Sequence, residues 1–455
     1  VCRSLRSRED LFDIYVLPIP WGQTGWISED NEEREWLDER IRATTEYGQS
    51  GGQFDISIQV TIPNEWQQMA PINVGVTAGI ESDMVAPIWL EQANKMKNII
   101  TISEHSKRGF IDSSYRGQNV ETGQDMTLKC NSPVDIVHYP AKIFKDLPEL
   151  DIHFDYDFNY LVVVQNGPRK NLENTIKWFV EENIDQEVGL VVKTFIKNNS
   201  IMDRVSADKF IKNMLKEYPE RKCKVYLLHG DMSDEEMHSL YVHPKIKCLV
   251  SLSHGEGFGL PIFEAAYSGL PIIAPGWSGQ CDFIYAPQQG NVKKKKKKGK
   301  QPYFAEVEYS IDHIPDFAVW EGVLMKESKW CYPREGSYKM RLRQVRKDYS
   351  KWNMNKKILF ISDYFVNQIS GGGELNDWEL INILKNSGNE VECLNSDKVS
   401  VEDILRFSSS GYRFVVSNFI NLNPDCIRAL SKNEKYAIYE HDHKYIIERN
   451  PSAYK

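Results

Sequence analysis

The sequence lacks the features that would mark an integral membrane protein or a secreted one. No run approaches the ~18 uninterrupted apolar residues that a membrane-spanning helix needs, and the N-terminal residues lack the apolar core of a signal peptide. The eight cysteines are scattered, with no CxxC pair and no spacing typical of a disulfide framework or a zinc site. We therefore expect a cytoplasmic protein without an integral membrane segment. Peripheral contact with a membrane stays open.

An excess of positive charge is also lacking. The 56 Lys and Arg residues are outnumbered by 64 Asp and Glu residues, which gives a net charge of -8. This balance argues against a nucleic-acid partner. Because 41% of the residues are hydrophobic and 26% are charged, the chain can bury a core and is not disordered. At roughly 150 residues for each domain, a chain of 455 residues predicts three domains.

Strand-like and helix-like segments alternate along the chain in three regions, at residues 1–145, 158–350 and 354–455. Such alternation implies βαβ units, so the expected fold class is α/β, with Rossmann-like, doubly wound parallel sheets. The predicted strands are residues 13–17, 54–60, 72–77, 98–103, 134–138, 160–165, 189–195, 223–228, 246–252, 271–274, 356–362, 390–394, 413–417 and 435–440. The predicted helices include residues 1–6, 82–96, 171–183, 261–269 and 320–349, one that follows the loop Gly371–Glu374 and runs to about Leu384, and one that opens with a capping box at Ser233–Glu236.

The most informative segment is a glycine-rich loop that follows the predicted strand 246–252 and leads into a helix at Pro261. Glycines let the backbone approach a ligand, and the free N–H groups of a helix N-terminus attract phosphate oxygens. Two carboxylates, Glu256 and Glu264, stand eight residues apart in this segment. Since a carboxylate accepts hydrogen bonds from vicinal hydroxyls, the pair suits a ligand with sugar rings on both sides of a diphosphate.

The segment Glu256-Gly-Phe-Gly-Leu-Pro-Ile-Phe-Glu264 resembles the E-x7-E signature of retaining GT-B glycosyltransferases of family 4, also called glycosyl transferases group 1. Upstream, Gln165–Asn171 resembles the first donor-domain loop of that family, and Leu190–Lys193 resembles the strand that bears its lysine. The resemblance implies that residues 1–145 form an acceptor-side domain and residues 158–350 a donor-binding domain across a cleft. It also implies transfer of a sugar from a nucleotide-sugar donor to a glycan or other hydroxyl acceptor, with retention of configuration and with no metal or other cofactor.

The same resemblance implies roles for individual residues. Arg169 and Lys193 would neutralise the donor diphosphate, and Glu256 would contact the transferred sugar near its reacting carbon. Glu264 would hold the ribose hydroxyls. The neighbouring Lys170 is expected to point to solvent. Backbone N–H groups would meet the sugar and phosphate along Gly257, Phe258, Gly259 and Leu260.

Structural alternatives stand beside these roles. Arg169 could cap the following helix, and Lys193 could be a solvent-exposed residue at a strand end. On the acceptor side, Glu81 and His105 could touch the acceptor hydroxyl, but a hydrogen bond at a helix start is the favoured role for either. The six lysines at 293–298 are interpreted as a solvated loop rather than a polyanion site.

Two short motifs could in principle bind a metal, and both are disfavoured. Asp155-Tyr-Asp157 mimics a D-x-D motif but lies in a polar linker, and His441-Asp-His443 has no evident third ligand. A dinucleotide oxidoreductase is disfavoured because no G-x-G-x-x-G follows a strand.

The ends of the three regions suggest a joined chain. The first region is expected to lack its opening strand, residue 1 is Val rather than Met, and a start-like Met-Asn-Lys-Lys occurs at Met354. We expect residues 354–455 to be the N-terminal half of a second glycosyltransferase-like domain. A rival hypothesis is that they fold back and complete the first sheet. The alternative function is a catalytically impaired nucleotide-sugar or carbohydrate-binding module.

Overall fold

The computed structural model describes most of the chain, namely residues 1–19, 30–118, 124–144, 146–287, 300–302, 304–349, 357–369, 371–386, 389–432 and 436–439. It divides the chain into two compact units. The first consists of residues 1–79, 84–137 and 320–325, and the second of residues 80–83, 138–319 and 326–455.

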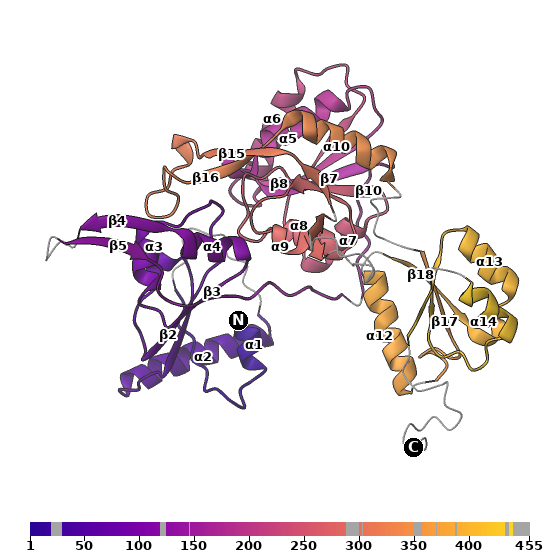
Figure 1. Ribbon diagram of the computed structural model, residues 1–455, viewed down its shortest axis with the longest axis horizontal. Helices are drawn as coiled ribbons and strands as arrows, with labels where there is room; N and C mark the ends of the chain where they lie inside the picture. Colours follow the sequence, from indigo (N-terminus) through magenta and orange to yellow (C-terminus); the bar gives the residue numbers. More distant parts are fainter. Residues whose placement is uncertain are drawn as a thin grey trace, which may run out of the picture. The chain divides into compact units, whose positions relative to one another are not determined.

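A four-stranded parallel sheet lies at the centre of the first unit (Figure 1). Its strands, in spatial order, are β1 (Ile56–Val60), β2 (Ile72–Val76), β3 (Asn98–Thr101) and β6 (Val134–Ile136). The helices of this unit are α1 (Cys2–Arg6), α2 (Glu32–Gln49), α3 (Pro87–Ala93) and α4 (Glu104–Asp112). Buried Trp66 and Trp89 each stack on buried Phe110 in its core.

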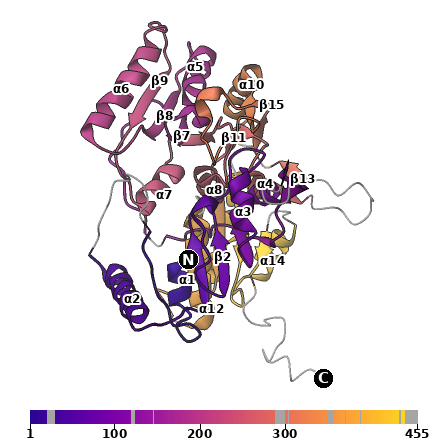
Figure 2. The same cartoon turned by 90° about the vertical axis from the view of Figure 1, so that its left-hand side faces the viewer.

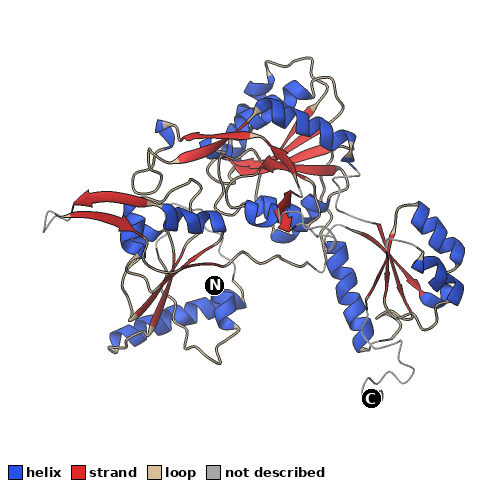
Figure 3. Cartoon of the chain, viewed as in Figure 1, coloured by secondary structure: helices blue, strands red, loops and turns tan. Residues whose placement is uncertain are grey.

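The first unit also corrects several predictions. Residues 13–17 do not form a strand. The helix expected from residue 82 begins only at Pro87, because the first turn is where proline's missing N–H costs nothing. Helix α2 was not predicted, nor was the antiparallel hairpin of β4 (Ser114–Gln118) and β5 (Asp125–Lys129), drawn as paired strands in Figure 3.

The second unit contains a six-stranded sheet in which every pair of neighbours is parallel. In spatial order the strands are β14 (Ala305–Val307), β11 (Ile272–Pro275), β10 (Ile246–Val250), β7 (Asn159–Gln165), β8 (Gly189–Phe195) and β9 (Lys224–Leu228). Five of these were predicted to within about two residues at their ends, because their cores are uninterrupted apolar runs. Such runs are expected where helices cover both faces.

Helices cover both faces of this sheet (Figure 1). Tyr160 and Val162 belong to the core on one face, whereas Leu161 between them belongs to the other core. The first face packs against α5 (Leu172–Glu182), α6 (Ile201–Leu215) and α10 (Glu335–Lys347), and the second against α7 (Asp234–Val242), α8 (Leu260–Tyr267) and α9 (Cys281–Ile284). Figure 2 shows α6 beside the edge strand β9. The capping box at Ser233 is present at the start of α7, as predicted.

The predicted helix over residues 320–349 is wrong in its first half. β15 (Tyr309–His313) and β16 (Lys329–Pro333) form an antiparallel pair, and α10 begins only at Glu335. A residue before proline avoids the helical region, so Pro333 separates the strand from the helix. A second antiparallel pair joins β12 (Tyr285–Pro287) to β13 (Lys300–Pro302).

The third region forms a parallel sheet of its own. Its strands are β18 (Glu390–Asn395), β17 (Lys357–Ser362), β19 (Arg413–Val416) and β20 (Tyr436–Ile438), in that spatial order. Helix α12 (Gly372–Asn386) covers one face, and α13 (Val401–Ser409) and α14 (Pro424–Ser431) cover the other (Figure 1). The third region is thus a parallel α/β sheet with helices on both faces, and its assignment to half of a second glycosyltransferase-like domain stays a prediction. Among the described strands, none of the third region completes the first sheet.

Several predictions concern residues outside the described ones, namely the lysine run 293–298, Met354 and His441-Asp-His443. Within the ranges that are described, no helix is both long enough and apolar enough to cross a membrane.

Candidate active site

The strand order of the six-stranded sheet places a topological switch point at the carboxyl ends of β7 and β10. From β7 the chain moves outward to β8 and β9, and it then returns to β10 on the other side of β7. The chain therefore continues from β7 and from β10 toward opposite edges of the sheet, and such a switch point is where open α/β sheets bind ligands. Both loops singled out from the sequence, residues 166–171 and 251–259, leave the sheet at this point.

Asn171 holds these two loops together. It adopts a left-handed conformation at φ 52° between the short 3-10 helix η2 (Pro168–Lys170) and α5. Asparagine tolerates this conformation better than most residues. Its side-chain amide donates to the carbonyl of Leu252 at 3.2 Å, and the His254 N–H donates to the carbonyl of Arg169 at 2.8 Å. The turn at Asn171 thus brings two consecutive cations toward the glycine-rich loop.

Glu256 is the centre of the site, with 8% of its surface exposed. Its Oε1 accepts from Lys170 Nζ, and its Oε2 lies 3.3 Å from Arg169 Nη1. Burial raises the pKa of the Glu256 carboxyl, but the charges of Lys170 and Arg169 outweigh that effect and hold the pKa below its usual value. Glu256 is therefore a buried, ionised carboxylate between two cations.

Lys170 corrects the sequence analysis, which expected it to point to solvent. Only 17% of its side chain is exposed, and it contacts the carboxylate that carries the family resemblance. Burial lowers the pKa of its ammonium group, with a further decrease from Arg169, while Glu256 opposes both.

The side chain of Arg169 does not make the contacts of a helix cap, which was its alternative role. Its Nη1 donates to the carbonyl of Gly255 at 2.6 Å, and its Nη2 lies 3.1 Å from Glu81 Oε1, within the second unit. Glu81, a predicted acceptor-side candidate, is thus an ion-pair partner of Arg169. The other candidate, His105, is the second residue of α4, whose N-cap is Ser103.

The glycine-rich loop approaches its neighbours closely, as its composition predicts. A Cβ on Gly255 would lie 1.9 Å from the carbonyl oxygen of Glu81. Gly259 has φ 90° and is the N-cap of α8, while the Phe258 side chain is buried against other aromatic rings. Between Gly257 and Gly259 the backbone, rather than the Phe258 side chain, is therefore what can face a ligand.

Glu264 lies in α8, apart from the Glu256 cluster. Its Oε2 accepts from the hydroxyl of buried Tyr241 at 2.9 Å. Burial raises the pKa of Glu264, although the Tyr241 hydrogen bond and the charge of Lys142 oppose this. A cavity of about 30 Å³ adjoins the carboxylate, and it is lined by Lys142, Phe144, Asp234, Met237, His238, Tyr241, Glu264 and Tyr267.

Lys193, the other predicted cation, is tied to the loop that follows β9. Its ammonium group donates to the carbonyl of Gly230, and burial lowers its pKa. Lys193 is partly buried near the end of β8, so it is not the solvent-exposed residue that the alternative role required.

Residues 153–301 match the family model described as glycosyl transferases group 1. This segment is a group 1 glycosyltransferase domain. It includes Arg169, Lys170, Lys193, Glu256 and Glu264.

Relatives of the group 1 domain are similar over limited lengths. A serotype-specific mannosyltransferase, WbdA, of Escherichia coli is 30% identical over 118 residues, which are 25% of this chain and 13% of that enzyme. Among solved structures, sucrose-phosphate synthase from Thermosynechococcus elongatus has 13% identity over 73% of this chain and 74% of its own, with a TM-score of 0.43. TarM of S. aureus, solved with UDP, has 18% identity over 49% of this chain and 40% of its own, with a TM-score of 0.31.

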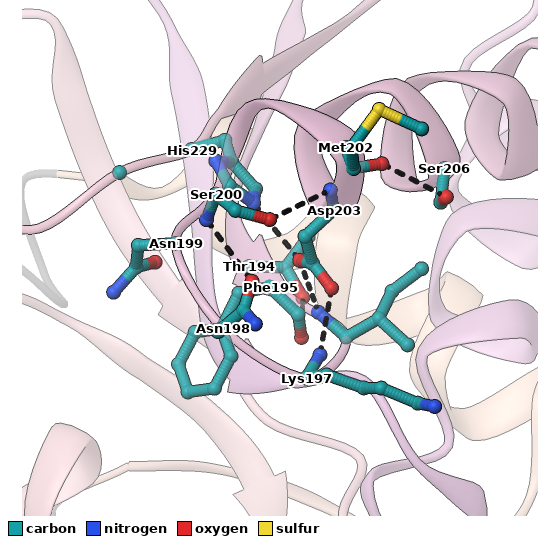
Figure 4. A network of polar contacts seen from close by, with 12 residues as sticks. Thr194, Phe195, Lys197, Asn198, Asn199, Ser200, Met202, Asp203, Ser206 and His229 are labelled. Atoms are coloured by element: carbon teal, nitrogen blue, oxygen red, sulfur yellow. Dashed lines mark hydrogen bonds and ion pairs between the residues drawn. The ribbon is translucent and has the colours of Figure 1, made fainter. Parts of the chain in front are cut away.

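A buried pair beside Lys193 escaped the sequence analysis. Asp203 accepts hydrogen bonds from the N–H groups of Ile196 and Lys197, each at 2.8 Å, and lies 2.9 Å from His229 Nε2 (Figure 4). Burial raises the pKa of Asp203, but these hydrogen bonds lower it to about 2. Asp203 and His229 are 26 residues apart, and no motif in the sequence links them. This pair fixes the loop that accepts the Lys193 ammonium group.

No cluster of three or more His, Cys, Asp or Glu residues that could hold a metal occurs in the described part of the group 1 domain or of the other regions. In the D-x-D motif, Asp155 pairs with Lys224 at 2.8 Å and Asp157 lies 3.4 Å from Lys245. The carboxylates of this motif are thus engaged by cations of the protein.

Proposed function

We propose that the chain is a GT-B glycosyltransferase that moves a sugar from a nucleotide-sugar donor to a glycan or other hydroxyl acceptor, with retention of configuration and without a metal. The observation that carries the proposal is the ionised Glu256 carboxylate, buried between Lys170 and Arg169 at the switch point of the donor-domain sheet.

The cations explain how a metal-independent reaction could proceed. A departing nucleoside diphosphate accumulates negative charge, which fixed cations stabilise most strongly where water is excluded. Lys170 and Arg169 are both partly or largely buried at the switch point of the sheet. Lys193 supplies a third cation from the same sheet. It lies on β8, two strands away from β10, and its ammonium group donates to the carbonyl of Gly230.

The carboxylates divide the recognition of the donor between them. In this proposal Glu256 contacts the transferred sugar near its reacting carbon, and Glu264 accepts hydrogen bonds from the ribose hydroxyls. The backbone N–H groups along Gly257, Phe258, Gly259 and Leu260 meet the sugar and phosphate, as the φ of 90° at Gly259 and the N-terminus of α8 allow.

Retention follows if the acceptor attacks from the face that the leaving group vacates. The bond between sugar C1 and the phosphate oxygen breaks, and a bond forms between C1 and the acceptor oxygen. The proton of the acceptor hydroxyl passes to the departing phosphate, so no dedicated base is required.

All eight cysteines are free thiols, which supports a reducing, cytoplasmic setting for this reaction.

A second candidate function is a binding module that has lost transfer activity. It is supported by the first unit, in which the described parallel sheet has only four strands. Such a module would bind or slowly hydrolyse the donor without passing the sugar to an acceptor.

The test is release of nucleoside diphosphate from UDP-glucose, UDP-N-acetylglucosamine and GDP-mannose in the presence of EDTA, with and without oligosaccharide acceptors. The proposal predicts acceptor-dependent release from one donor, unaffected by the chelator. Release that is independent of every acceptor would favour the binding module, and a strict metal requirement would contradict the proposed mechanism.

A further inference from the structure

The loop that follows β11 holds the backbone of Glu256 from two sides. The N–H of Glu256 donates to Ser278 Oγ at 2.9 Å, and the carbonyl of Glu256 accepts from the N–H of Gly279 at 2.9 Å. The lysine and arginine described above hold only the carboxylate of Glu256, so this loop determines where its backbone lies.

The hydroxyl of Ser278 is itself fixed by the protein. It donates to Gln280 Oε1 at 2.8 Å, and Gln280 Nε2 donates to the carbonyl of Pro275, at the end of β11, at 3.3 Å. Ser278 is 5% exposed and Gln280 is 1% exposed, so water does not compete for these bonds. A buried path of hydrogen bonds therefore runs from the end of β11 through Gln280 and Ser278 to Glu256.

Ser278 adopts a backbone conformation that serine rarely takes. Its φ is 73°, in the left-handed region that favours glycine. Such outliers persist where the surrounding structure enforces them, and they cluster at functional sites. Glycine would relieve this strain but would remove the hydroxyl that Glu256 uses.

The loop is also packed too closely for a larger residue beside Ser278. A Cβ on Gly279 would lie 2.0 Å from the carbonyl oxygen of Gly257. The backbone of the loop after β11 thus lies directly against the backbone of the glycine-rich loop.

We propose that Ser278 is a positioning residue for catalysis, which sets the place of Glu256 relative to the donor sugar through the path from Gln280. This inference rests on the proposed function and deepens it. Because Ser278 acts on the residue nearest the reacting carbon, its loss should lower kcat, while the KM for the donor should change little.

The experiment compares Ser278→Ala with Ser278→Gly. Both variants remove the hydroxyl and leave the Glu256 N–H without its partner, so kcat should fall about tenfold or more in each. Only the glycine variant relieves the backbone strain, so its Tm should be higher than that of the alanine variant. The expected result is therefore an equal loss of kcat at unequal stability, with the KM for the donor within about twofold of wild type.

Ser337→Ala is the matched control. Ser337 is also buried, at 8% exposed, and its hydroxyl accepts from the N–H of Glu308 at 2.9 Å, away from the glycine-rich loop. The Ser337→Ala variant should have a lower Tm than wild type but an unchanged kcat. If kcat instead follows Tm across the three variants, Ser278 has only a structural role and the inference is wrong.

The two proposals fail in different ways. A wild-type chain that turns over none of the three nucleotide sugars contradicts the proposed function and with it this inference. An active wild type whose Ser278→Ala and Ser278→Gly variants both retain full kcat contradicts the inference alone.

Discussion

Lys170 and Arg169 are consecutive residues, yet both reach the carboxylate of Glu256. Side chains of adjacent residues usually diverge, and the sequence analysis assigned one of this pair to the site and the other to solvent. The left-handed Asn171 and the short helix η2 redirect the chain so that the two cations converge. Residue spacing singled out the two loops that the structure brings together, but it contains no information about such a local turn.

We predict that Lys170→Met lowers kcat for donor turnover by about a hundredfold or more. Loss of one fixed charge that stabilises the developing negative charge in the transition state has an effect of this size. Methionine keeps the length of the side chain, so the fold should persist. Lys339→Met is the control, since Lys339 is also partly buried and paired, with Glu181 and Glu335, but lies in α10. Equal losses of kcat in both variants would contradict the role of Lys170.

Glu264→Gln should separate stability from donor binding. Burial raises the pKa of Glu264, so its ionised form opposes folding as the pH rises above the unfolded value near 4.3. At pH 7 the neutral glutamine should therefore keep or raise Tm, while it weakens donor affinity about tenfold by removing a charged acceptor for ribose. Thermal shifts with and without the nucleoside diphosphate measure both effects. Unchanged affinity would show that Glu264 does not contact the donor.

At the scale of elements, the pair of Asp203 and His229 joins the loop after β8 to the loop after β9. Asp203 belongs to α6, and it also accepts two backbone N–H groups that precede this helix. The path continues through Gly230 to Lys193, so the connection between two elements positions a proposed catalytic cation.

Asp203→Asn should cost about 2 kcal/mol of unfolding free energy at pH 7, since the pKa of Asp203 is lowered from 3.8 to about 2 in the folded protein. A lowered carboxyl pKa stabilises the fold above the unfolded value. The difference between wild type and variant should therefore shrink as the pH falls from about 4 to about 2. Denaturant titrations across this range measure it. Asp208→Asn, in the exposed pair with Lys212, should change stability by less than about 0.5 kcal/mol at any pH.

Five strands of the six-stranded sheet could be predicted because their apolar runs differ clearly from the polar segments around them. Helix α2 and the hairpin of β4 and β5 could not. Trp36 is the only buried residue of α2, and the strands of the hairpin are almost entirely exposed, so neither shows a strong apolar period. Their position depends on contacts that are distant in the sequence.

At the scale of the whole molecule, the described residues form three separate parallel sheets. The sheet of the third region has its own core, formed by residues such as Leu359, Ile404, Phe414 and Leu430. This separate core is consistent with the predicted boundary near residue 350, which truncation of the chain can test.

A chain truncated after residue 349 should remain folded and should keep donor turnover within about twofold of the full chain, because domains with their own cores fold independently. Limited proteolysis of the full chain should release a stable piece ending near the same residue. Unfolding of the truncated chain would contradict the independence of the third region.

The anomeric configuration of the product tests the account most directly. Wild type should be supplied with the donor that it uses and with an acceptor, in EDTA, and the new linkage should be examined by NMR. We predict the same configuration as in the donor, and loss of product formation in Glu256→Gln. An inverted product, or full activity in that variant, would contradict the proposed retaining mechanism at Glu256.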